Sequence, residues 1–150
     1  EESIIILNRL KNKLEVLEQD LRDIIQRDPQ HAHAYNALGY TLADRTSRLE
    51  EAKTLIEKAL KLAPDDAFIL DSMGWVLYRQ GQLSSSLDYL QRAWDKQNDP
   101  EIAAHLGEVL WQQGQTQAAE NLWHKALRQN QNNENLQQVM QKFLGRHAQP

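Results

Sequence analysis

One short pattern recurs three times along this chain at nearly constant spacing, and it restricts the possible folds more than any other feature. Leu or Met directly precedes a glycine, and Leu follows three residues later, with the glycine at Gly39, Gly74 and Gly107. The glycines are thus 35 and 33 residues apart. A unit of this length cannot bury its apolar surface alone, so its repetition indicates a stack of similar units that cover one another.

Each glycine lies in the first of two amphipathic stretches within its unit. In one unit, Ile69, Met73 and Val76 have the spacing of a single helical face, and Gly81 ends that stretch. The second stretch of each unit carries a stripe of alternating small and large residues at helical spacing. The small residue that ends this stripe recurs as Ala59, Ala93 and Ala126. Each unit is therefore predicted to be a pair of helices.

Composition agrees with a helical fold. The 150 residues are 41% hydrophobic, which is enough for a sizeable core, and only four are proline and six glycine. No run of alternating β-branched residues is long enough to indicate a strand. We therefore predict an all-α fold, a superhelical solenoid of antiparallel helix pairs that forms one domain over 1–145. The expected parts are a partial unit over 1–28, full units over 31–65, 66–99 and 100–131, a capping helix over 134–144, and a disordered tail over 146–150.

Residues 1–28 allow two interpretations. If Pro29 closes a unit, Asn12 falls at a turn between two short helices, and we favour this arrangement. The alternative is one long helix over 3–27, because the leucines keep helical spacing through the expected turn. If further repeats precede this segment, the apolar run Ile4–Leu7 would pack on them.

Charge and residue content argue against several functions. The formal net charge is −4, from 17 basic and 21 acidic side chains without a basic block, so nucleic acid is not an expected partner. Cysteine is absent, and no apolar run reaches the roughly 18 residues that a membrane span needs. His31 and His33 are interpreted as surface residues at a helix start and not as metal ligands, because residues two apart point to different sides of a helix. Without a recognisable nucleophile, phosphate loop or metal cluster, we expect neither catalysis nor a cofactor.

The repeat length, the glycine in the first helix, the small residues in the second and the prolines Pro29 and Pro64 at unit ends resemble the tetratricopeptide repeat. The resemblance implies a non-catalytic module in which the first helices of successive units line a concave groove that binds a peptide or a protein. The inward positions that it assigns in this chain are Asn36, Tyr40, Asp71, Trp75, Tyr78, Arg79, Glu108, Trp111 and Gln112.

We expect the four aromatic rings at these positions to be exposed and to form the binding surface, rimmed by Asp71, Arg79 and Glu108. The alternative is that the rings pack against neighbouring helices. Trp123, by contrast, holds the large position of a second helix and is predicted to lie in the core. The inward carboxylates argue against a clamp for a peptide's terminal carboxylate and favour a partner with apolar side chains and a few basic groups.

A finer resemblance lies in AYNALGYTLADRTSRLEEA, ILDSMGWVLYRQGQ and PEIAAHLGEVLWQQGQ. These strings are similar to the C-terminal repeats of long tetratricopeptide proteins in Gram-negative bacteria, among them outer-membrane lipoproteins that act as adaptors for a periplasmic carboxyl-terminal processing protease. The resemblance covers about residues 14–130. It implies an adaptor or scaffold fragment on the periplasmic side, with that protease or its substrates as partners. A cytoplasmic location, and a structural segment that self-associates into homo-oligomers, are the alternatives.

Overall fold

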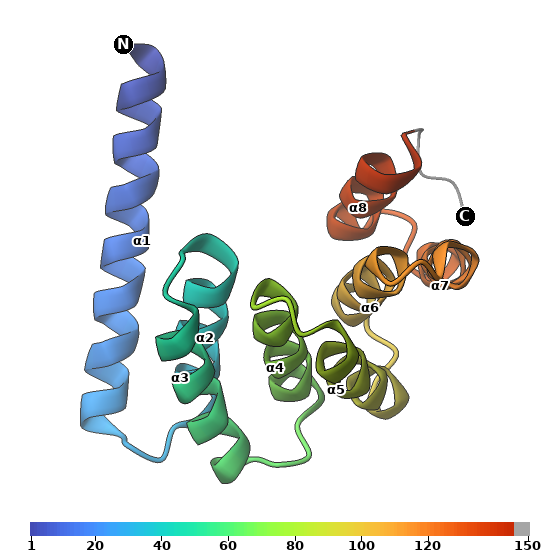
Figure 1. Ribbon diagram of the computed structural model, residues 1–150. Coiled ribbons are helices and arrows are strands. Elements are labelled where there is room, and N and C mark those ends of the chain that lie inside the picture. Colours follow the sequence, from blue (N-terminus) through green and yellow to red (C-terminus); the bar gives the residue numbers. More distant parts are fainter. Residues whose placement is uncertain (146–150) are drawn as a thin grey trace.

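The computed structural model describes residues 1–145, which form eight α-helices and no strand (Figure 1). The solenoid of helix pairs predicted from the repeat is confirmed, and the tail predicted over 146–150 lies outside the described residues. The helices are α1 (Glu2–Arg27), α2 (Ala32–Arg45), α3 (Leu49–Leu62), α4 (Ala67–Arg79), α5 (Leu83–Lys96), α6 (Pro100–Gln112), α7 (Thr116–Gln129) and α8 (Glu134–Leu144).

The pairs α2–α3, α4–α5 and α6–α7 are the three repeats seen in the sequence. Within the stack, α4 packs on both helices of the pair before it, and α6 packs on both α4 and α5. The core therefore follows the curved row of pairs instead of filling one centre (Figure 1). Trp123 is fully buried, as predicted for the large position of a second helix.

The repeated glycine lies where the two helices of a pair cross. A Cβ atom at Gly74 would lie 2.5 Å from Leu90 Cγ and 3.2 Å from the carbonyl oxygen of Ser86. Ser86 is itself buried, and its hydroxyl donates to the carbonyl oxygen of Gly74 at 2.6 Å. A Cβ atom at Gly39 would similarly lie 2.6 Å from the Cγ1 atom of Ile56. The glycine is thus required for close packing of helices and not for a turn.

The first 28 residues contradict the favoured prediction of two short helices. One continuous helix spans Glu2–Arg27. That span contains no Gly or Pro to favour a turn, and Asn12 lowers helix propensity by less than about 1 kcal/mol. Leu21 and Ile25, near its C-terminal end, pack against the core of the first full pair. The side chains of Ile4–Leu7 are exposed, and this end of α1 projects past the stack (Figure 1).

A network of charged side chains fixes α1 to α3. Glu18 accepts hydrogen bonds from both terminal nitrogens of Arg48 at 2.8 Å and from Arg22 at 2.7 Å. Arg22 also donates to Glu51 at 2.7 Å. The hydrogen bonds from Arg48 and Arg22 lower the pKa of Glu18 to about 2. This carboxylate therefore stays ionised at any pH near neutrality.

The last helix, α8, covers the apolar side of the final pair. Its Val139 and Met140 are buried in one cluster with Trp123. The Asn133 side chain caps the start of α8 by accepting a hydrogen bond from the Leu136 amide. Gly145 ends the helix in the left-handed conformation, at φ 67°. Over residues 1–145, no helix is both long enough and apolar enough to cross a membrane.

Candidate functional site

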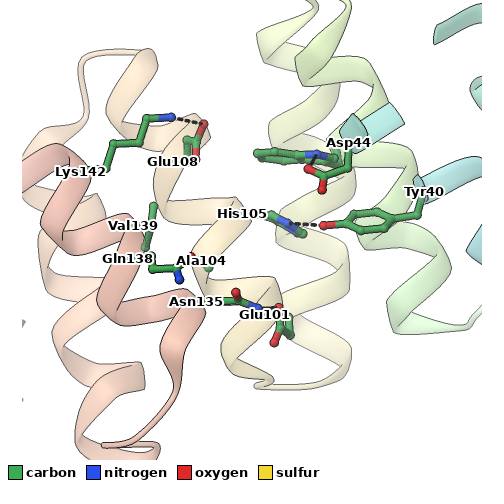
Figure 2. Close-up of a pocket in the computed structure, with 11 residues that line it drawn as sticks. Tyr40, Asp44, Glu101, Ala104, His105, Glu108, Asn135, Gln138, Val139 and Lys142 are labelled. Atoms are coloured by element: carbon green, nitrogen blue, oxygen red, sulfur yellow. Dashed lines mark hydrogen bonds and ion pairs between the residues drawn. The ribbon is translucent and has the colours of Figure 1, made fainter. Parts of the chain in front are cut away.

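Three adjoining cavities follow the face of the stack that is formed by α2, α4, α6 and α8. The central cavity has a volume of about 290 Å³, and Tyr40, Glu101 and His105 line it. A cavity of about 220 Å³ shares these three residues with it, and a cavity of about 620 Å³ shares Trp75 and Glu108 with it. Because each outer cavity shares lining residues with the central one, we call the three together the inner groove. Figure 2 shows the central cavity, with residues of α8 on one side and residues of α2 on the other.

A chain of hydrogen bonds joins three repeats across the inner groove. His105 Nδ1 on α6 lies 2.9 and 3.0 Å from the two carboxylate oxygens of Asp71 on α4. Its Nε2 atom lies 3.2 Å from the hydroxyl of Tyr40 on α2 (Figure 2). Because a carboxylate only accepts, the Nδ1–H of His105 donates to Asp71, and Nε2 accepts from Tyr40 when the ring is neutral. The chain therefore holds α2, α4 and α6 at a fixed separation.

The His105 ring is only 12% exposed and titrates in an unusual environment. Burial lowers the pKa of His105. The charge and the hydrogen bond of Asp71, together with the charges of Asp44 and Glu101, raise the pKa by more than burial lowers it. The pKa of His105 therefore lies above the ordinary histidine value. Burial, with the charges of Asp44 and Asp71, also raises the pKa of the Tyr40 hydroxyl far above its usual range. Tyr40 therefore remains protonated and serves as a hydrogen-bonding group.

Trp75 corrects the expectation of an exposed aromatic surface. Its residue exposure is only 8%, and its ring stacks on His105 with ring centres 4.2 Å apart. The indole Nε1–H donates to the Asp44 carboxylate at 3.2 Å, which links α4 to the end of α2. Trp75 still lines both the central and the largest cavity. Its ring is thus a packed part of the groove wall and not a projecting anchor.

Carboxylates on α6 are held by neighbouring helices on both sides. Glu108 accepts a hydrogen bond from the Tyr78 hydroxyl at 2.8 Å, and the Lys142 ammonium of α8 lies 3.9 Å from it. Glu101, two turns earlier on the same helix, accepts a hydrogen bond from the Asn135 side chain of α8. In Figure 2 these two residues of α8 lie along one wall of the central cavity. The predicted capping helix therefore also forms part of the inner groove.

The structure brings most of the predicted site residues together. All except Trp111 line one of the three cavities, with Asn36 at one end and Arg79 and Gln112 at the other. Trp111 instead packs against Trp123 and Phe143, with ring centres 6.0 and 5.7 Å away, as in the alternative of rings packed between helices.

Two of the residues predicted to form an exposed rim, Asp71 and Glu108, are mostly buried. Asp71 is only 5% exposed, because it is packed under His105 and bonded to it. Glu108 is likewise mostly covered, with its side chain 12% exposed. Arg79 is exposed, and its Nε–H donates to the carbonyl oxygen of Ala43 at 3.0 Å. Which of these groups contacts a ligand stays a prediction.

Sequence reasoning missed His105 and the side chains of α8. A signal for His105 was present, since the equivalent positions two residues before the repeated glycine hold the small residues Ala37 and Ser72. A histidine at such a position must reach into the space between repeats. Asn135 and Lys142 had no counterpart in the other units, because α8 has no repeat partner with which to compare it.

The site contains no arrangement suited to metal chemistry within the part of the chain that the structure describes. No three His, Asp or Glu side chains there come close enough together to hold a metal ion. His31, one of the two histidines interpreted as surface residues, accepts a hydrogen bond at its Nδ1 atom from the Ala34 amide at the start of α2. What the groove offers is a set of rings, hydroxyls and carboxylates in fixed positions.

The sequence matches a longer bacterial protein. It is 56% identical over 103 residues to a TPR repeat-containing protein of Pseudomonas aeruginosa, and the match covers 69% of this chain and 18% of that protein. The chain thus spans less than a fifth of the length of the curated relatives that it matches.

Solved structures show the same fold at low sequence identity. A thermophilic TPR protein of Thermus thermophilus superposes with a TM-score of 0.75 at 22% identity, covering 91% of this chain and 77% of that one. YrrB, a TPR protein described as having an unusual peptide-binding site, gives a TM-score of 0.57 at 23% identity, covering 91% and 79%.

Two family models, both described as tetratricopeptide repeat, match residues 32–66 and 77–143. Together they cover more than half of the sequence. The first match covers the pair α2–α3 with Gly39, and the second runs from the end of α4 into α8 and includes Gly107. Spacing in the sequence, packing in the structure and these matches agree, and the chain belongs to the tetratricopeptide repeat family.

Proposed function

We propose that this chain is a non-catalytic peptide-binding module whose inner groove holds a segment of a partner protein. Tetratricopeptide repeats are typically protein interaction modules and are generally non-catalytic. The observation that carries the proposal is that the cavities of the inner groove share lining residues with one another and are lined together by residues of all three repeats and of α8. Concave surfaces of stacked repeats commonly serve as extended binding sites.

The wall of the inner groove is preorganised, which favours binding. Tyr40, Trp75 and His105 are fixed by hydrogen bonds and ring stacking before any ligand arrives, so little side-chain entropy is lost on binding. One acceptor is also unused. Asn36 Oδ1 is buried at the end cavity and has no hydrogen-bond partner within residues 1–145. A backbone N–H of a bound peptide would satisfy it.

An adaptor role in a larger bacterial envelope protein is the finer form of this proposal. Its supports are the likeness of the repeats to those of adaptor lipoproteins and the match to a much longer protein of Pseudomonas aeruginosa. In that setting the partner would be a periplasmic carboxyl-terminal processing protease or its substrates. A pull-down from an envelope extract with the protease present and deleted tests this form separately.

The experiment for the inner groove blocks it without disturbing the core. Gln138 is an exposed residue of α8 that lines the central cavity, and Gln141 is exposed on the same helix without lining any of the three cavities. We expect Gln138→Trp to abolish binding of fluorescein-labelled, acetylated hexapeptides selected from a library, and Gln141→Trp to leave it unchanged. Equal binding by both variants, or no hexapeptide bound by the parent chain, refutes the proposal.

Self-association is the second candidate function, and one observation favours it. The side chains of Ile4, Ile5, Ile6 and Leu7 are between 51% and 64% exposed on the projecting end of α1. An apolar surface of this kind commonly marks an interaction site. Light scattering at two protein concentrations tests it, since self-association predicts a mass that rises with concentration, and Ile5→Glu with Leu7→Glu should remove the rise.

A further inference from the structure

We infer that the central cavity of the inner groove receives a basic side chain, arginine or lysine, of the bound peptide. The inference rests on the proposed function and names the chemical class that this site selects. Its basis is the combination of a cavity that opens to solvent, aromatic rings in its wall and an excess of negative charge. Charge complementarity of this kind steers a partner and sets its register in a groove.

Three carboxylates line the central cavity, from two different helices. They are Asp44 at the end of α2 and Glu101 and Glu108 on α6. Each is held in place by a neutral donor, the Trp75 indole, the Asn135 amide and the Tyr78 hydroxyl in that order. A neutral donor fixes the position of a carboxylate but leaves its negative charge in place.

The cations close to this cavity are too few to balance these charges. Lys142 is the one lysine or arginine among the lining residues, and its side chain is 67% exposed. Its ammonium lies 3.9 Å from Glu108, at the outer limit of an ion pair. A positive charge on His105 would be matched by the buried Asp71 carboxylate with which it shares a hydrogen bond. The cavity therefore retains an excess of negative charge in either state of the histidine.

The adjoining cavity of about 620 Å³ has a different balance of charge. It shares Asp44, Glu108 and Lys142 with the central cavity but adds Arg79, so its two carboxylates face two cations. The excess of negative charge is thus larger in the central cavity, where Glu101 is added and Arg79 is not. It extends into the cavity of about 220 Å³, which Glu101 also lines and which no lysine or arginine lines. A peptide with one basic residue would be placed in a defined register by this difference.

The chemistry of the wall favours an organic cation over a metal ion. The carboxylates are distributed around the cavity, and no three acidic or histidine side chains in residues 1–145 converge closely enough to ligate a metal. The aromatic rings of Tyr40 and Trp75 line the same cavity. A guanidinium group can lie against a ring and donate hydrogen bonds to a carboxylate at once, so we expect arginine to bind more tightly than lysine.

Lys142 has a defined role in this scheme. It is a side chain of the protein that already places an ammonium group at the wall of the central cavity (Figure 2). An incoming basic side chain would compete with it for Glu108. Removal of Lys142 should therefore tighten binding of a basic peptide, whereas removal of a carboxylate should weaken it. The two substitutions shift affinity in opposite directions, which a loss of folding cannot produce.

The test uses the full chain and a positional-scanning library of acetylated, fluorescein-labelled hexapeptides, measured by fluorescence anisotropy. We expect arginine to be selected at one position. Replacement of that arginine by citrulline, which has the same shape without the charge, should weaken binding by about tenfold or more. Lysine at that position should give an intermediate affinity. Glu101→Gln should weaken binding of the arginine peptide but not of the citrulline peptide, and Lys142→Gln should strengthen binding of the arginine peptide by a few fold.

The matched control is Asp20→Asn, which makes the same change of charge on the exposed surface of α1. It should leave both peptides unaffected. Equal affinity for the arginine and citrulline peptides, or an apolar residue selected at every position, overturns the inference and leaves the proposed function intact. If the parent chain binds no hexapeptide at all, the proposed function fails and the inference fails with it.

Discussion

Replacing Gly74 by alanine tests whether the repeated glycine exists for helix packing. The new methyl carbon would lie 2.5 Å from Leu90 Cγ and 3.2 Å from the backbone oxygen of Ser86. Leu90 is fully buried, so its side chain must move by roughly 1 Å into packed neighbours to restore an ordinary contact. The Ser86 oxygen belongs to the backbone of α5 and can move only with the helix.

The expected magnitude is the difference between two effects. Overpacking a core costs about 1–3 kcal/mol, and the rigid surroundings of Gly74 place this change near the upper end. Alanine recovers about 1 kcal/mol of helix propensity relative to glycine. We therefore expect Gly74→Ala to lower the free energy of unfolding by about 2 kcal/mol, which corresponds to a fall in melting temperature of about 4–8 °C for a domain of this size.

The assay is urea unfolding followed by circular dichroism, and a double-mutant cycle makes it specific. Leu90→Ala alone should cost about 2–5 kcal/mol through the cavity that it leaves. In the double variant the new methyl group fills part of that cavity, so the combined loss should fall short of the sum by about 1 kcal/mol or more. Ser85→Ala, on the exposed side of α5, should change stability by less than about 0.5 kcal/mol. A Gly74→Ala chain as stable as the parent, or strictly additive losses, would refute the packing argument.

Three further predictions concern charge and burial. Because the pKa of His105 is raised in the folded state, its contribution to stability is complete below about pH 6.5, the ordinary histidine value, and is lost as the pH rises through the folded pKa. Melting curves from pH 5 to 9 should show this fall in stability, and the fall should be absent in Asp71→Asn. Trp75→Ala should cost about 3–5 kcal/mol in urea unfolding, and an unchanged midpoint would contradict its place in the packed wall. Glu18→Gln should lower the free energy of unfolding by about 0.5–1 kcal/mol at low salt and by less in 1 M NaCl, and a loss independent of salt would contradict an electrostatic role. In the parent chain, the contribution of Glu18 to stability should be lost as the pH falls from about 4.3 toward its folded pKa of about 2.

Most of the fold was predictable because each unit repeats the same packing problem. Gly39, Gly74 and Gly107 fixed the period, and the stripe of alternating small and large residues on the following helix indicated which helices pair. The large residues of that stripe, Ile56, Leu90 and Trp123, are the ones that face the glycines. The helix of the first 28 residues was mispredicted because the closing proline, Pro29, was given more weight than the lack of a turn-forming residue before it. A periodic pattern locates helices well, but it does not show whether a helix is interrupted when the leucine spacing continues through the boundary.

The candidate site was predictable in position and less so in detail. The resemblance to the tetratricopeptide repeat assigned the inward positions, in agreement with the helical period, and Tyr40 and Glu108 at two of these positions line the central cavity. Burial does not follow from it, because the exposure of Trp75 depends on His105, a residue from the next repeat that stacks on it. The wall contributed by α8 could not be found by comparing repeats, since Lys142 belongs to the one helix that has no counterpart. Contacts between units need coordinates, whereas contacts within a unit recur in the sequence.

The bond between Tyr40 and His105 reaches past an intervening repeat, from α2 to α6, and this changes how the molecule should come apart. A solenoid with contacts only between adjacent units melts as a linear chain of neighbours, so its ends can fray independently. Here the loss of α6 would also deprive α2 of a partner, because the two are tied directly. Opening at the C-terminal end should therefore be felt at Tyr40, and hydrogen exchange in α2 should accelerate in a His105→Ala chain even though α4 separates the two helices.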